Sequence, residues 1–181
     1  MATATPTPTT MPWQIPGGPR TRAMVFLWKL LATTIIYVML AEIGSWMSIH
    51  SLDGLVHILW PASGLALAMV MRGGAKYLIS VFVGFTIWSC WLNQGSLNYT
   101  LWLAGSYTLS TCIGCFILRN VLKASYSLEA IVDVLGFLFA GALFTGMLNA
   151  SIGVSVTIFY LDDIPWTEFS RLWQPWFLGD S

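Results

Sequence analysis

The stretch MVFLWKLLATTIIYVMLAEIGSWM, residues 24–47, decides the fold class of this chain. It contains only two charged side chains, Lys29 near its start and Glu42 near its end. A helix needs about 20 consecutive apolar residues to cross the ~30 Å hydrocarbon layer of a bilayer. The stretch is therefore predicted to be a transmembrane helix.

The rest of the chain has the same apolar character. Of its 181 residues, 56% are hydrophobic and 9% are charged, whereas about a quarter of the residues of a soluble domain are charged. The net charge is zero, so no overall field attracts nucleic acid. Three cysteines without framework spacing do not indicate a disulfide scaffold. Composition thus excludes a soluble enzyme domain and indicates the lipid bilayer as the partner.

Further apolar stretches of similar length follow the first. The predicted spans are residues 24–47, 55–71, 75–92, 99–118 and 130–161. Because lipid cannot satisfy backbone N–H and C=O groups, these spans are predicted to be helices. The fifth exceeds one crossing and is expected to tilt, to bend near Gly153 or to leave the membrane early. A sixth stretch, residues 169–181, is too short to cross. The predicted fold is an all-α polytopic transmembrane bundle with five full spans and an incomplete sixth.

The first 23 residues differ from the rest. They are rich in Pro, Gly and Thr and are predicted to form a disordered leader before a transmembrane domain at residues 24–181. Most of the Lys and Arg residues fall on the side of this leader: Arg20, Arg22, Lys29, Arg72, Lys76, Arg119 and Lys123. The positive-inside rule then places the N-terminus in the cytoplasm.

Two places in the first two spans are candidates for function. A carboxylate in hydrocarbon is costly, so Glu42 is a candidate functional residue; the simpler alternative is that it reaches the interface or pairs with a donor from another helix. Pro61 follows Trp60 and frees a backbone carbonyl, while Gly64 permits a close backbone approach. These residues are predicted either to pack helices or to form one wall of a small ligand pocket.

Small residues at four-residue spacing predict where helices pack closely. The candidates for helix packing are Ser110, Gly114, Ala142, Gly146 and Ala150, with Asn149 predicted to form a hydrogen bond across helices. Cys112 and Cys115 form a C-x-x-C pattern without a second pair of ligands, so no metal and no cofactor is predicted. No motif for a catalytic residue is present either.

The order of several motifs resembles a known family. Trp60-Pro61-x-x-Gly64 is followed by Gly74, Gly84, Asp133-Val134, Gly153 and finally Trp176-Phe177-Leu178-Gly179-Asp180. This order is similar to the first class of bacterial membrane-associated sensor domains, the MASE type-one family, over roughly residues 24–181. The resemblance implies a sensory input module of the bacterial inner membrane. Such a module passes a signal to a cytoplasmic kinase or diguanylate cyclase effector, fused or separate.

The resemblance also implies how the chain ends. The helix that begins near residue 169 is expected to run through Gly179 and Asp180 and to continue, so the chain looks truncated at its sixth helix. The predicted ligand-binding residues are Glu42, Trp60, Pro61, Gly64, Trp176, Gly179 and Asp180. A homodimer is a candidate arrangement, and enzymatic activity is not predicted. The alternative is a small membrane transporter or channel subunit, supported by Glu42, Asn149 and the proline-interrupted helix.

Overall fold

The computed structural model describes residues 18–47, 49–51, 54–56, 60–92, 94–123, 131–161 and 164–180. Most of the predicted leader, residues 1–17, lies outside this part of the chain. The elements, with η for 3-10 or π-helical turns, are α1 (Pro19–Trp46), β1 (Ile49–Ser51), β2 (Gly54–Val56), α2 (Pro61–Gly73), η1 (Ala75–Tyr77), α3 (Leu78–Ile87), η2 (Trp88–Leu92), α4 (Leu97–Phe116), η3 (Ile117–Val121), α5 (Ile131–Gly136), η4 (Phe137–Leu143), α6 (Phe144–Tyr160), η5 (Trp166–Glu168) and α7 (Phe169–Asp180).

Several of these elements join into longer helices. η2 extends α3, η3 extends α4, and α5, η4 and α6 form one continuous helix. Within the described residues, four helices have the length and composition to cross a membrane: Pro19–Trp46, Ala75–Leu92, Leu97–Val121 and Asp133–Tyr160. They correspond to the first, third, fourth and fifth predicted spans.

The second predicted span differs from the structure. Residues 55 and 56 belong to a short antiparallel hairpin in which Ile49 pairs with Val56, and α2 starts only at Pro61. Proline lacks an N–H and disfavours the helical conformation in the residue before it, so the helix cannot extend backwards. With 13 residues, α2 rises about 20 Å, which is less than a full crossing. The prediction of one helix over residues 55–71 is therefore wrong at its start.

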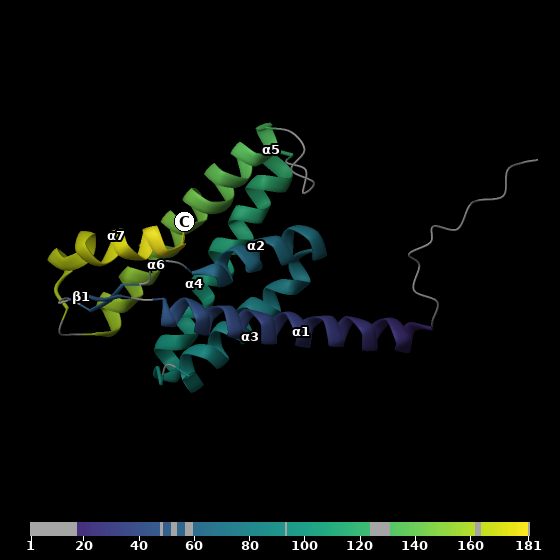
Figure 1. Ribbon diagram of the computed structural model, residues 1–181, viewed down its shortest axis with the longest axis horizontal. Coiled ribbons are helices and arrows are strands. Elements are labelled where there is room, and N and C mark those ends of the chain that lie inside the picture. The colour runs from purple at the N-terminus through teal and green to yellow at the C-terminus, as the bar shows by residue number, and fades with distance from the viewer. Residues whose placement is uncertain are drawn as a thin grey trace, which may run out of the picture.

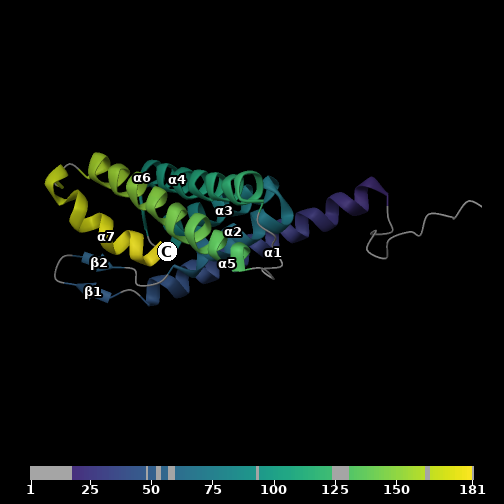
Figure 2. The ribbon, with the colours of Figure 1, turned by 90° about the horizontal axis from the view of Figure 1, so that it is seen from above.

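The helices form a bundle around α4 (Figure 1). α1 packs on α2 and α3, α3 packs on α4, α4 packs on α6, and α6 packs on α7. The hairpin lies at the end of the bundle where α7 begins, as Figure 2 shows from above. Gly74, with a φ of 90°, lets the chain turn between α2 and η1, a conformation that glycine adopts readily. α7 runs back toward the centre of the bundle, where α2 begins.

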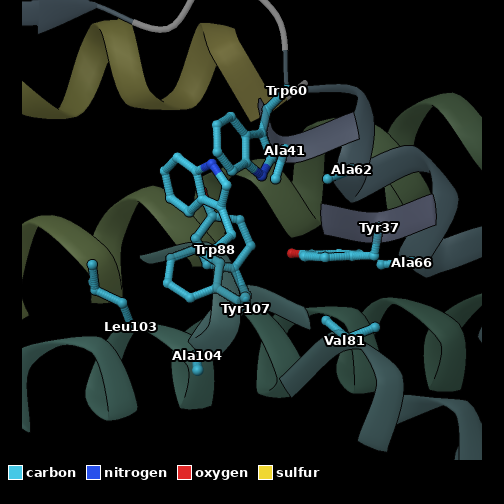
Figure 3. Packing of buried hydrophobic residues seen from close by; sticks show 11 residues of the cluster. Tyr37, Ala41, Trp60, Ala62, Ala66, Val81, Trp88, Leu103, Ala104 and Tyr107 are labelled. Carbon is cyan, nitrogen blue, oxygen red and sulfur yellow. The ribbon is translucent and has the colours of Figure 1, made fainter. Parts of the chain in front are cut away.

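An aromatic cluster fills the centre of the bundle (Figure 3). The rings of Trp60 and Trp88 meet edge to face at 4.8 Å between centroids, and those of Phe85 and Tyr107 stack at 4.7 Å. Tyr37 of α1 is fully buried, and its hydroxyl points into the cluster. Large apolar side chains such as Trp28 and Met39 are exposed on the outside of α1 instead. This distribution suits a bundle whose surroundings are lipid acyl chains.

Candidate functional site

The site is built where the last turn of α7 meets the first turn of α2. The backbone N–H of Trp60 donates a hydrogen bond of 2.7 Å to the carbonyl of Gly179. The Ser63 hydroxyl lies 3.5 Å from the carbonyl of Asp180. The last carbonyls of a helix have no partner within it, so α2 supplies donors that α7 lacks. The negative end of one helix dipole thus meets the positive end of the other.

Asp180 places a carboxyl group at this junction. Its side chain is 7% exposed. The Tyr107 hydroxyl lies 3.3 Å from both carboxyl oxygens, and the Asn149 amide donates a further hydrogen bond to Oδ2. Asn149 in turn accepts a hydrogen bond of 2.8 Å from Ser106 through Oδ1. No lysine or arginine in the described part of the chain forms an ion pair with Asp180. Side chains of α4 and α6 therefore hold the carboxyl group of α7.

Trp176 fixes the position of α7 on α6. Its indole N–H lies 3.3 Å from the Tyr107 hydroxyl, which joins it to the hydrogen bonds around Asp180. Its ring covers Gly153, where an added Cβ would lie 2.8 Å from Trp176 Cζ2. Glycine is needed at this position because any side chain would push the indole away.

Two cavities border the junction. A cavity of about 20 Å³ lies among Asp180, Tyr107, Ser110 and Asn149, which is room for about one water molecule. A larger cavity of about 200 Å³ lies between the start of α2 and the η4–α6 helix. An added Cβ on Gly64 would meet nothing within 4 Å.

Most of the predicted ligand-binding residues lie at the larger cavity. The start of α2 with its N-cap and the end of α7 line one side, through Trp60, Pro61, Ser63, Gly64, Leu67, Gly179 and Asp180. The η4–α6 helix lines the other side, through Phe137, Gly141, Ala142 and Thr145. Trp176 is not part of the lining and acts on the site through Tyr107.

Glu42 lies outside this group. Its carboxylate accepts hydrogen bonds from the indole of Trp46, at 2.9 Å, and from that of Trp88, at 3.2 Å. It faces neither cavity. This arrangement matches the simpler of the two interpretations, in which the carboxylate pairs with a donor from another helix. It touches the site only indirectly, because Trp88 packs against Trp60.

The predicted packing residues lie between α4 and the η4–α6 helix, with one difference. Gly114 lets Thr145 approach so closely that an added Cβ would overlap its methyl group. Ser110 donates a hydrogen bond to the Ser106 carbonyl at 2.8 Å. Gly146, Asn149 and Ala150 are buried, whereas Ala142 lines the larger cavity.

Sequence reasoning missed Tyr107, whose hydroxyl contacts Asp180, and Tyr37, which lies in the neighbouring aromatic cluster. Tyr37 and Tyr107 both come from the middle of a predicted span, where a hydroxyl is too deep to reach water. That depth was a signal available in the sequence, since buried hydroxyls need a partner. Ser63 lies inside the W-P-x-x-G motif, which the sequence marked as a possible pocket wall, and it lines both cavities.

The structure offers few groups for binding a metal. Within the described residues, no three His, Cys, Asp or Glu side chains come together. Cys112 is exposed while Cys115 is buried, with its Sγ 3.7 Å from the Leu67 carbonyl, so the two thiols do not share a site. The side chains around Asp180 instead present a carboxyl group, hydroxyls and an amide beside a cavity. Such groups suit the binding of a small polar ligand.

Comparison with known proteins identifies a family. The MASE1 family model matches residues 28–181. No curated protein matches the chain, and no solved structure does.

Proposed function

The chain belongs to the MASE1 family of membrane-associated sensor domains, and from this premise we propose that it is the sensory input module of a bacterial signal-transduction protein. It receives a signal within the membrane and passes it to a cytoplasmic effector. Its role is reception, and catalysis belongs to the effector.

One observation carries this proposal: α2 and α7 meet head to tail at a buried acid beside a cavity. α7 is held by the hydrogen bonds around Asp180 and by the packing of Trp176 on Gly153 of α6. A small polar ligand that enters the 200 Å³ cavity would compete for those bonds and favour a second position of α7. A ligand shifts an equilibrium by its difference in affinity for the two states, so contact with Asp180 in one of them is sufficient.

The topology and partners follow the charge pattern and the family. The N-terminus lies in the cytoplasm of a bacterial cell, and the chain is a multi-pass protein of the inner membrane. α2 belongs to the second of five proposed crossings, and α7 makes the incomplete sixth. A kinase or diguanylate cyclase, fused or separate, receives the signal, and a second copy of the chain is a candidate partner.

The test uses the chain in its natural gene context, with the cellular cyclic-di-GMP level and kinase phosphorylation as outputs. Asp180→Asn replaces the carboxyl group with an amide, and Gly64→Leu places an apolar side chain at the wall of the cavity, where an added Cβ meets nothing within 4 Å. Both are expected to abolish the response of the output to growth conditions. The control is Glu168→Gln, which removes an acid that pairs with Arg171 on the exposed surface. A normal response in both site variants would remove this site from the mechanism.

A second candidate function is supported by the same junction. Interrupted helices that meet near the centre of a bundle are typical of transporters, where they form substrate sites. A small transporter or channel subunit would therefore also place an acid here. Solute flux in vesicles containing the purified chain distinguishes the two, because a sensor module conducts nothing.

A further inference from the structure

A separate cavity of about 590 Å³ lies between α1 and α2, away from Asp180. It is found at the end of the bundle where the positive residues gather. Its lining includes Lys29, Thr33, Met69, Arg72, Gly73 and Tyr77. The remaining lining residues are alanines. The cavity therefore combines two cationic side chains with a largely apolar wall.

The depth of this cavity fits the edge of the hydrocarbon layer. Lys29 and Trp46 lie on α1 about 26 Å apart along the axis, at 1.5 Å per residue. That is close to the hydrocarbon thickness. Trp46 at one end is typical of an interface, so Lys29 lies near the opposite one. Arg72 in the last turn of α2 lines the cavity with Lys29 and so reaches the same depth.

Within the described part of the chain, no carboxylate pairs with the cations that line this cavity. Neither Lys29 nor Arg72 forms an ion pair with any residue that the structure describes. A third cation, Lys76, lies nearby with its Nζ 4.7 Å from the Phe26 ring and 6.0 Å from the Tyr77 ring. The Tyr77 ring packs directly on Gly73 and closes one side. The positive charge of this cavity is therefore suited to binding an anion.

We propose that this cavity binds one anionic phospholipid from the leaflet at this end of the bundle. The phosphate lies between Lys29 and Arg72, and an acyl chain follows the wall formed by Ala32, Ala68 and Met69. Basic pockets between transmembrane helices bind anionic headgroups in this way. A free anion would leave the apolar wall uncovered, which favours a lipid. The proposal is independent of the sensory role of the Asp180 site.

Native mass spectrometry of the whole chain in detergent tests this proposal. The probes are phosphatidylglycerol and phosphatidylcholine with identical acyl chains. Each cation near a lipid surface favours an anionic lipid by about fivefold, so phosphatidylglycerol is expected to bind at least about tenfold more tightly. Lys29→Gln combined with Arg72→Gln should lower the affinity for phosphatidylglycerol to that for phosphatidylcholine. The matched control, Arg20→Gln with Arg22→Gln, removes the same charge at the same end but outside the cavity.

A second variant tests the wall rather than the charge. Ala68→Trp fills the cavity while leaving both cations in place. It should lower the binding of both lipids. This variant also tests the proposal if the double charge variant does not fold. Equal binding of the two lipids to the unaltered chain would overturn the proposal. Equal loss in the Arg20 and Arg22 control would show diffuse attraction instead of a site. Displacement of the lipid by soluble glycerol phosphate would assign the cavity to a free anion.

Discussion

At the residue scale, the site depends on how completely its buried polar groups are paired. Asp180, Asn149 and Ser106 form a chain of hydrogen bonds through three helices, with Tyr107 as a further donor. A buried polar group that loses its partner costs about 1–3 kcal/mol. Each member of this chain is therefore expected to contribute to stability as well as to the site.

Asn149→Ala should lower the free energy of unfolding by about 1–3 kcal/mol, because it removes one of the donors to Asp180 and leaves the Ser106 hydroxyl without its acceptor. Asn120→Ala is the matched control, since Asn120 is exposed and bonds only to the Phe116 carbonyl of its own helix. Its effect should stay below about 0.5 kcal/mol. Unfolding in mixed micelles, followed by tryptophan fluorescence, measures both. Equal effects would contradict the network described here.

Gly153→Ala should displace the Trp176 ring and destabilise the chain by about 1–3 kcal/mol, because the new methyl group enters an already packed contact. Gly105→Ala is the control, since an added Cβ at Gly105 meets nothing within 4 Å. Alanine also favours a helix over glycine by up to about 1 kcal/mol, so the control should be neutral or slightly stabilising. Melting temperatures in detergent compare the two, and a stabilised Gly153→Ala variant would refute the contact.

Glu42→Gln should leave the cellular response unchanged, although Glu42 was among the predicted ligand-binding residues. Its carboxylate is occupied by Trp46 and Trp88 and does not line either cavity at the junction. Glutamine keeps an oxygen for one of those bonds. The same output assay used for Asp180→Asn measures this variant. A loss of response as complete as that of Asp180→Asn would return Glu42 to the site.

At the scale of the elements, the short helices α2 and α7 differ from the long ones. α4 is packed by α2, α3 and α6, whereas α7 packs chiefly on α6. Elements with fewer neighbours open at lower free energy than the core of a protein. We therefore expect α7, which carries Asp180, to open more readily than α4.

Hydrogen exchange measured by mass spectrometry should show this difference. Amides of residues 169–180 are expected to exchange faster than those of residues 97–116. Asn149→Ala should speed exchange in the first range by about tenfold or more, because 1.4 kcal/mol corresponds to a factor of ten in a local opening equilibrium. Equal acceleration in α4 would indicate global unfolding instead of movement of α7.

The sequence predicted the long helices well because hydropathy alone sets them. It predicted α2 poorly, since residues 55 and 56 are apolar yet pair in a hairpin, and Pro61 was read as a kink instead of a start. The family resemblance is confirmed by the match over residues 28–181. Tyr37 and Tyr107 were missed because their role depends on how each helix is rotated. A helix that is apolar on all sides gives no periodic signal for that rotation.

At the scale of the whole molecule, charge and apolar surface define its place in the membrane. Exposed side chains such as Leu27, Trp102 and Phe139 cover the outside of the bundle. Lys76 lies in the first turn of the span Ala75–Leu92, and Arg119 lies in the last turn of the span Leu97–Val121, both at the ends predicted to face the side of the leader. This asymmetry supports a cytoplasmic N-terminus.

Cysteine labelling in intact cells checks this orientation. The three native cysteines are first replaced, and single cysteines are introduced at Lys76, Leu109 or Thr167. An impermeant maleimide should label the Thr167 position in intact cells and the Lys76 position only after lysis. Leu109→Cys is the control, because Leu109 lies mid-helix with its side chain exposed on the outside of α4 and should stay unlabelled in both. Labelling of the Lys76 position in intact cells would reverse the topology.

The head-to-tail contact between α2 and α7 also bears on biogenesis. Ser63 and Asp180 are 117 residues apart in sequence. A ribosome therefore completes α2 long before it delivers the α7 carbonyls that accept hydrogen bonds from Trp60 and Ser63. During that interval the nascent chain must shelter the amide of Trp60 and the side chain of Asn149 by other means. Membrane-embedded chaperones or protease surveillance would therefore act on this protein mainly before residues 169–180 emerge.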